Sequence, residues 1–389
     1  MTKTTTTITG LVPTIFEAFD IVAAEQVGFI PAVSRDASPE RAAVGQTIRS
    51  PVVGAMAAED LTVDNVSASA PDQTINYVDM SITKARSVPF GITGEETLGL
   101  GDQMAVVNRD RISQALRTLR NEVETDLAAL HASASRAYGT FNTTPFGTAD
   151  VFTDFAQPKK ILKDNGAPQS DLHMVLGGEA IANMTGKQSS LFKVNEAGSE
   201  DLLRNGRLGR VVGWDIHDSA QVKESVTVGT NNGSAATTAA GFALGATTIA
   251  LGSAGTGTII AGDIITIAGD TNKYLVVSGE GDVSDGGSIT IAAPGLRVAI
   301  GTSATVVTTI AATNRNMFFH RSAIQLATRA PAMPDGGDSA DDVMVITDPY
   351  SGIGFEFCVY RQKRQVRWEV NLAWGVNMNK AEFAGVLIG

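Results

Sequence analysis

The longest regular pattern of apolar and polar positions in the chain runs from Gln103 to about Arg136. Its apolar residues recur at steps of three and four, which places them on one face of a helix. They are Ile112, Leu116, Leu119, Val123, Leu127, Leu130 and Ala134. A helix of this span would be about 50 Å long, which is typical of a spine between two lobes. An ordinary packing helix or a coiled-coil strand would show the same stripe, so the neighbouring segments must decide.

The residues before this helix change character several times. Thr2–Thr9 is a threonine-rich arm without an apolar face, expected to be flexible or draped over a neighbour. Leu11 to about Val27 has the spacing of a short amphipathic helix, and Phe29–Ser38 predicts a turn-rich connection.

Two strand-like runs, Gln46–Val53 and Thr74–Ile92, flank a polar stretch of small residues at Gly54–Gln73. Two strands joined by a long polar excursion predict an extended hairpin that projects from the body. A disordered surface loop is the alternative.

After the long helix the pattern becomes mixed α/β. Helices are predicted at Thr153–Asn165 and Gly178–Gly186, and strands at Leu172–Leu176 and Arg210–Ser219. Gln221–Ala312 then lacks helix signals and is rich in Gly, Thr, Ser, Ile and Val. Its strands are predicted at Thr247–Leu251, Asp263–Ala268, Lys273–Ser278, Ser288–Ala293 and Ala304–Ile310. This stretch predicts an all-β barrel or sandwich inserted into an α/β protein.

The last segment returns to strongly patterned structure. Asn316–Ala327 has the composition of a buried strand, and Pro331–Asp342 predicts an acidic loop. Phe355–Tyr360 and Gln365–Ala373 predict a hairpin, and the second strand alternates apolar with polar residues, so one of its faces is buried. We expect this hairpin to pack against the long helix.

Composition narrows the function classes. The chain has 389 residues, 43% hydrophobic and 18% charged, and a formal net charge of -11, so a broad surface that neutralises DNA phosphates is disfavoured. An acidic protein is better suited to lie near nucleic acid without sticking to it. The single cysteine, Cys358, excludes an internal disulfide framework. The sequence contains no apolar leader and no membrane span, so we expect a soluble, unexported protein.

The sequence contains few candidates for a catalytic or metal-binding motif. The four histidines, His131, His173, His217 and His320, are far apart in sequence and show no zinc-like spacing. Asp215 and His217 share one face of a predicted strand and Asp218 follows, but polar residues at a strand edge explain them better than an acid–base pair. We therefore predict no catalytic, cofactor-binding or metal-binding residues and no cofactor.

Three further motifs have a simple structural reading. Gly252, Gly255 and Gly257 lie between strands with no helix after them, which argues against a dinucleotide site. Glu280, Asp282 and Asp285 have calcium-like chemistry, yet a glycine-rich hairpin tip explains them more simply. The basic turn of Arg361, Lys363 and Arg364, with Arg367, has the charge for nucleic acid, but a solvated turn or an intersubunit ion pair is favoured.

The order of these elements resembles that of a tailed-phage major capsid protein of the HK97 fold, and most closely the P22 coat protein family with its inserted β-barrel. The segments that carry the resemblance are QTIRSPV (Gln46–Val52), ITKARSVPFGIT (Ile82–Thr93), GRVVGWDIHDS (Gly209–Ser219), AGDIITIAG (Ala261–Gly269), TNRNMFFHRSAIQLATRAP (Thr313–Pro331) and LAWGVNMNKAEFAGVLI (Leu372–Ile388). They cover nearly the whole chain but include no chemical signature, so the order of elements and the length carry more weight.

The resemblance implies an α+β protein with an N-terminal arm, an E-loop hairpin, a spine helix, an axial α/β domain and an inserted all-β or immunoglobulin-like domain. The expected divisions are 1–45 (arm and helix), 46–93 (E-loop), 94–146 (peripheral domain), 147–220 (axial domain), 221–312 (insertion) and 313–389 (return and final hairpin). Lys84 lies near the E-loop, but the sequence offers no support for a lysine–asparagine crosslink there.

The function implied is self-assembly, without enzymatic activity, into an icosahedral virion shell around double-stranded DNA. The expected partners are other copies of the chain in hexamers and pentamers, a scaffolding protein, a portal and weakly contacted DNA, with assembly in the host cytoplasm and no membrane. The alternatives are a phage tail-tube or adhesion subunit and an encapsulin-like compartment shell. An enzyme would need a convergent polar pocket.

Overall fold

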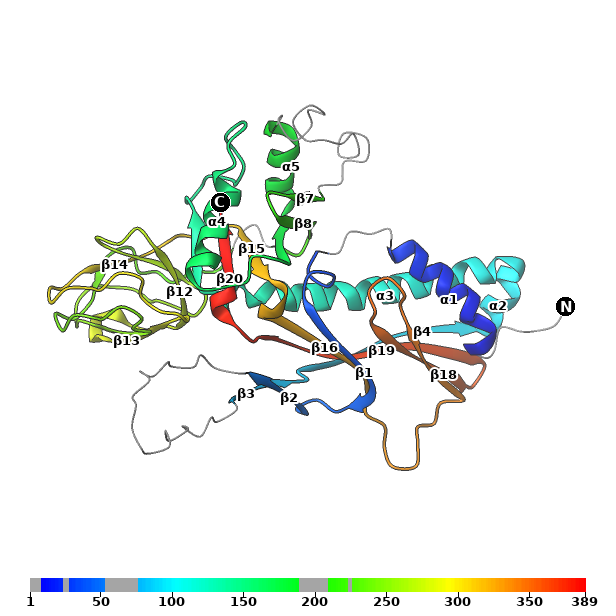
Figure 1. The fold of residues 1–389 in the computed structure, drawn as a ribbon. Coiled ribbons are helices and arrows are strands. Elements are labelled where there is room, and N and C mark those ends of the chain that lie inside the picture. Colours follow the sequence, from blue (N-terminus) through cyan, green and yellow to red (C-terminus); the bar gives the residue numbers. More distant parts are fainter. Residues whose placement is uncertain (1–7, 24–27, 53–75, 189–208, 223–225) are drawn as a thin grey trace, which may run out of the picture.

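The computed structural model describes residues 8–23, 28–52, 76–188, 209–222 and 226–389 (Figure 1). The predicted flexible arm lies outside these ranges, apart from its last two residues, which begin the first helix. The predicted tip of the projecting hairpin, 54–73, also lies outside them. The described residues form both helices and sheets, so the expected α+β class is confirmed.

The long helix α3 spans Met104–Ala129 and buries the predicted apolar stripe from Ile112 to Leu127 (Figure 1). Its 26 residues correspond to about 39 Å. The prediction that it continues to Arg136 is wrong, because a 3-10 turn at Leu130–Ser133 follows and Arg136–Gly139 is strand β5. Pairing of β5 with two other strands outweighs the local helical pattern.

A separate helix, α2 (Gly94–Leu100), precedes α3. Its first turn is closed by a capping box in which the Thr93 hydroxyl accepts the Glu96 N–H and the Glu96 carboxylate accepts the Thr93 N–H. Helix α1 (Ile8–Ala23) packs its apolar face on α3. It begins at Ile8, earlier than the predicted helix at Leu11–Val27.

Beneath α3 in Figure 1 lies a six-stranded sheet, here called the long sheet. Its strands are β1 (Ser34–Ala42), β4 (Lys84–Thr93), β16 (Ile324–Pro331), β17 (Asp342–Thr347), β18 (Gly354–Gln362) and β19 (Gln365–Met378). Strand β19 pairs with β4, β16 and β18, and the predicted hairpin is confirmed as β18–β19. Its packing on α3 is confirmed as well.

Strand β1 corrects part of a prediction. Of the expected turn-rich connection Phe29–Ser38, residues 29–33 do form turns and bends, but Ser34–Ser38 belongs to the strand. Its sequence, SRDASPERA, shows no alternation of apolar and polar residues, because β1 forms an edge of the sheet. Its pairing partner is β16, nearly 300 residues later in the chain. The expected single strand Asn316–Ala327 is also wrong. A 3-10 turn at Arg321–Ala323 divides it into β15 (Arg315–His320) and β16, which belong to different sheets.

The second sheet contains β15 between β6 (Leu172–Leu176) and β20 (Ala384–Ile388), and β6 pairs in parallel with β8 (Trp214–Asp218). Strand β7 (Arg210–Val211) pairs with β8 at the edge. One face of β6 packs with helices α4 (Thr153–Asp164) and α5 (Gly178–Lys187). The predicted helices and strands here are confirmed to within a residue or two, except that a turn divides Arg210–Ser219 into β7 and β8.

Between β8 and β15 the chain forms the β-rich region, defined here as Ala235–Thr309, at one end of the molecule (Figure 1). Its strands continue the second sheet beyond β5. Its strands are β9 (Ala235–Ala236), β10 (Thr248–Leu251), β11 (Ile264–Ile267), β12 (Lys273–Ser278), β13 (Gly287–Ile291) and β14 (Val306–Thr309). They enclose their own apolar core, and β12 joins β5 at the border with the body. The predicted strands are confirmed, while the domain limits stay a prediction.

Candidate assembly surfaces and a histidine pair

A two-stranded ribbon projects below the long sheet and is the first candidate surface (Figure 1). It consists of β2 (Thr47–Val52) and β3 (Asn76–Ser81), which pair only with each other in the described part of the chain. Arg49 and Asp79 form an ion pair of 2.9 Å across it, and this contact lowers the pKa of Asp79. The Arg49 guanidinium also lies over the Tyr77 ring, which is 53% exposed.

The base of the ribbon is tied to the body. Met80 and Ile82 are buried against Ala327 and Ala373 of the long sheet. The backbone of the ribbon passes very close to Gly375 of β19. A Cβ added at Gly375 would lie 2.1 Å from the Ser81 carbonyl oxygen. Because a two-stranded ribbon in water is marginally stable by itself, its outer part needs another surface to pack on.

The long helix is joined to the long sheet by a polar contact at Asp126. Its carboxylate accepts a bond of 2.6 Å from Lys84 Nζ on β4 and one of 2.8 Å from the Trp374 indole N–H on β19. Lys84 is therefore paired with Asp126 of the same chain, and the absence of a crosslink at this residue stays a prediction.

A buried carboxylate fixes the segment that follows α1. Glu124 of α3 is 1% exposed and accepts the backbone N–H groups of Phe29 (3.0 Å) and Ile30 (2.7 Å). The Ser219 hydroxyl donates to it from the end of β8, at 3.1 Å. Burial raises the pKa of Glu124, and these hydrogen bonds oppose that shift. Two segments that are distant in sequence thus converge on one side chain of α3.

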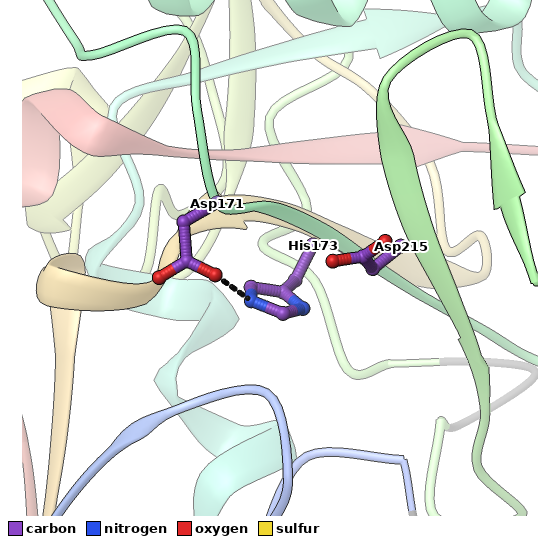
Figure 2. Close-up of side chains that lie close together, drawn as sticks. All are labelled: Asp171, His173 and Asp215. Atoms are coloured by element: carbon purple, nitrogen blue, oxygen red, sulfur yellow. Dashed lines mark hydrogen bonds and ion pairs between the residues drawn. The ribbon is translucent and has the colours of Figure 1, made fainter.

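Contrary to the expectation from sequence spacing, two of the four histidines meet. His173 Nδ1 of β6 lies 3.0 Å from His217 Nε2 of β8. On the other side of the His173 ring, Nε2 lies 3.0 Å from an Asp171 carboxylate oxygen (Figure 2). Asp215 of β8 lies beside this pair, as the alternation along β8 predicts.

Burial dominates the electrostatics of this histidine cluster. It lowers the pKa of His173, and burial together with His173 lowers the pKa of His217 to about 4. Arg321 donates to the second oxygen of Asp171 at 3.1 Å. The sequence signal was one histidine on each of two predicted strands, but their pairing required knowing that β6 and β8 are neighbours.

The other motifs named from the sequence form turns, local hydrogen bonds and surface ion pairs. In the acidic tip, Asp282 accepts the Ser284 N–H at 2.9 Å and the Ser284 hydroxyl at 2.7 Å. In the basic turn, Arg361 pairs with Asp341 at 3.2 Å and Arg367 with Glu369 at 2.7 Å. Gly255 and Gly257 have φ near +100° at turns of the β-rich region. Within the described ranges, no helix is long and apolar enough to cross a membrane.

No protein-family model and no curated protein matches the chain. Solved structures similar over most of its length include one described as Mycobacterium phage Che8, with 13% identity and a TM-score of 0.47, covering 88% of this chain and 84% of that chain. The capsid of cyanophage P-SCSP1u has 11% identity and a TM-score of 0.47, covering 94% and 88%. The SrpI encapsulin of Synechococcus elongatus has 9% identity and a TM-score of 0.40, covering 92% and 86%.

Proposed function

We propose that this chain is the major capsid protein of a tailed phage, with an HK97-like fold, and that it self-assembles into an icosahedral shell around double-stranded DNA. The observation that carries the proposal is the β2–β3 ribbon, which extends from an elongated body and exposes Tyr77. A neighbouring subunit would supply the surface that the ribbon lacks in the isolated chain.

The arrangement of the body supports a structural role. A long helix lies along a long sheet, the second sheet with α4 and α5 stands at its side, and the β-rich region lies at one end (Figure 1). The formal net charge of -11 suits a container whose contents must not adhere to its wall. The phage capsid and encapsulin structures named above are shells, as the proposal requires of this chain.

The partners in this proposal are copies of the same chain in hexamers and pentamers. A scaffolding protein, a portal and weakly contacted packaged DNA complete the set, with assembly in the host cytoplasm and the virion as final location. The divisions of the chain at 46, 94, 147, 221 and 313 are part of the proposal.

Electron microscopy and light scattering of the purified chain, with and without co-expressed phage proteins, test the proposal. Closed particles or rings of five and six subunits are expected. Stacked rings or tubes would favour a tail protein and contradict the proposal, as would a monomer or dimer unchanged by crowding and by a scaffolding protein. Particles that retain a protein cargo and no DNA in infected cells would favour a cellular compartment shell.

The ribbon itself is tested with Tyr77→Asp, which places a charge on its exposed face. We expect assembly to fall at least tenfold while tryptophan fluorescence of the subunit stays unchanged, because the Tyr77 side chain is 53% exposed. Tyr77→Phe is the matched control, since it keeps the ring that contacts Arg49. Normal shells from Tyr77→Asp would reject the ribbon as an assembly surface.

A further inference from the structure

The long sheet ends on one side in β17, whose outer edge pairs with no other strand in the described part of the chain. Val345 and Thr347 of this strand are exposed on one face of the sheet. Met344 and Ile346 lie on the opposite face, where they pack with the core beneath α1. The backbone along this edge is therefore available to a further strand.

The register of the β17–β18 hairpin shows which backbone groups face outward. The Asp348 N–H donates to the Ile353 carbonyl at 2.9 Å, in the same register in which β17 pairs with β18. Because hydrogen-bonded pairs alternate along an antiparallel ladder, every second residue of β17, counted back from Asp348, bonds to β18. The residues between them direct their N–H and C=O groups toward the unpaired side, and these are Val343, Val345 and Thr347.

Three other free sheet edges in the described part of the chain are protected against such pairing. The sequence of β1 contains a proline and four charged residues, and its register is irregular. Strand β4 contains Lys84, Arg86 and Pro89, and β7 has only two residues. Proline, charge, bulges and short length are the features by which proteins keep sheet edges from pairing. The VMVI sequence between Asp342 and Thr347 of β17 has neither proline nor charge.

We propose that β17 pairs with β17 of a second copy of this chain, antiparallel and about a two-fold axis. With the axis at Val345, the two Val345 residues form a hydrogen-bonded pair, and Val343 of each copy pairs with Thr347 of the other. These three pairs use the outward backbone groups of both strands. All their residues are β-branched, the class favoured in strands. The two long sheets then form one continuous sheet.

Exposed apolar side chains beside this edge fit the same partner. Helix α1 packs on β17 and β18, and its Phe16 and Ile21 are 43% and 39% exposed. Tyr350, in the turn after β17, is 59% exposed and donates to Asp20 of α1 at 2.7 Å. A two-fold axis perpendicular to the sheet places α1 of both copies on the same side of it. The exposed groups of one helix then approach those of the other, whereas a lone extended peptide would leave them in water.

The N-terminal arm of the chain is the alternative occupant of this edge. The Ile8 N–H, at the start of α1, donates to Asp342 at 3.0 Å, so α1 begins beside the first residue of β17. The two occupants differ in charge. The arm carries Lys3, whereas two copies of a chain with a net charge of -11 repel each other, and the pairing also brings Asp342 of one copy near Asp348 of the other. Added salt should therefore strengthen the pairing of two copies and weaken the binding of the arm.

Sedimentation velocity of the untagged full-length chain, at concentrations below those at which particles form, measures the pairing. We expect a monomer–dimer equilibrium that shifts toward the dimer in higher salt. Val345→Lys, which gives β17 the charge that protects other edges, should weaken the dimer at least tenfold. Val306→Lys is the matched control, because Val306 is 44% exposed on a strand of the β-rich region, and it should dimerise like the parent chain.

A disulfide tests the position of the axis. Cys358→Ala removes the one native cysteine, and Val345→Cys in that background places two thiols across a hydrogen-bonded pair. The Cα atoms of such a pair are about 5.5 Å apart, a separation that suits a disulfide. Mild oxidation should therefore give a covalent dimer, and Val306→Cys in the same background should not.

A monomer at every concentration, a dimer unaffected by Val345→Lys, or no covalent dimer from Val345→Cys would overturn the proposal. A dimer that is lost on deletion of residues 2–7 and weakens in salt would identify the arm as the occupant and would also overturn it. The proposal rests on the proposed function in that its partner is a second copy, but the two can fail separately. Normal shells from Val345→Lys, without a covalent dimer from Val345→Cys, would reject the pairing and leave the shell. Dimers without particles would do the reverse.

Discussion

The β-rich region and the body around α3 are stabilised in different ways. In the β-rich region, neighbouring segments pair with one another, as in β11 with β12 and β12 with β13. Its core is almost entirely aliphatic, and Asp263 is the one charged side chain that it buries, every residue of this region being described. In the body, β1 pairs with β16 and β4 with β19, so the sheet joins opposite ends of the chain.

The body also buries several charged groups among its described residues. They include Arg120, Glu124, Arg329 and Glu356. A buried charge is tolerated only when surrounding groups satisfy it, and here those groups come from distant segments, as at Glu124. The comparison indicates that the β-rich region depends on local pairing and apolar contact, whereas the body depends on polar groups that meet only in the complete fold.

The largest effect is expected for Glu124→Ala, which leaves the buried donors of Phe29, Ile30 and Ser219 without an acceptor. We expect a loss of about 3–5 kcal/mol of unfolding free energy in the body. Tryptophan fluorescence in urea measures it, because Trp214, Trp368 and Trp374 all lie in the body. Glu122→Ala is the control, since Glu122 makes only a 3.5 Å surface pair with Arg86. Equal losses of unfolding free energy in the two variants would show that the buried Glu124 carboxylate does not stabilise the body more than a surface glutamate does.

A core truncation in the β-rich region should act locally. Ile265 of β11 is fully buried, and Ile265→Ala should destabilise this region by about 2–4 kcal/mol. Amide hydrogen exchange of β10–β14 should speed up while the tryptophan midpoint of the body changes little. Val306→Ala, at a side chain that is 44% exposed, is the control. A fall of the tryptophan midpoint as large as the local effect would show that both regions unfold as one unit.

A glycine turn tests the local geometry of the β-rich region. Gly255 has φ of +103°, and an added Cβ would lie 2.5 Å from the Ser234 carbonyl oxygen. Gly255→Ala should therefore cost about 1–3 kcal/mol, measured by amide exchange in the same region. Gly281→Ala, where nothing lies within 4 Å of the added atom, should be nearly neutral. A neutral Gly255→Ala would mean that the turn adjusts freely.

The smallest effect is a pH dependence of the body. The pKa of His217 is about 4 in the folded chain against 6.5 for the unconstrained residue, so the fold favours the neutral ring. The stability that this contributes is complete above pH 6.5 and is lost as the pH falls toward 4. Groups facing the ring are His173, Asp215 and Arg321.

Urea unfolding at pH 7 and pH 5.5 should show on the order of 1 kcal/mol more destabilisation for the parent chain than for His217→Gln. Asp285→Asn, on the exposed tip of the β-rich region, is the control. Its unfolding free energy should change with pH as that of the parent chain does. The same change of unfolding free energy with pH in the parent chain and in His217→Gln would show that protonation of His217 does not affect folding.

Much of the local structure could be predicted from the sequence. The predicted strand Lys273–Ser278 coincides with β12, and the stripe from Ile112 to Leu127 is the buried face of α3. The hairpin β18–β19 follows from alternation along its second strand. These features depend on residues that are neighbours in sequence, and their periodicity is visible without knowledge of the fold.

The errors occurred where distant partners decide the outcome. β1 has no apolar alternation because it is an edge strand, and β5 replaces the last predicted turns of the long helix because two other strands pair with it. His173 and His217 were treated as separate because their strands were not known to be neighbours.

The sequence by itself therefore determined the long amphipathic helix, the strands of the β-rich region, the acidic surface and the order of elements that suggests a shell subunit. Only the tertiary structure decided where α3 ends, that the segment after α1 forms an edge strand, and that a carboxylate and two histidines meet partners from distant segments. The physical reason is that apolar periodicity is a local property, whereas the hydrogen bonds of sheet edges and buried polar groups are completed by whichever segments the fold brings to them.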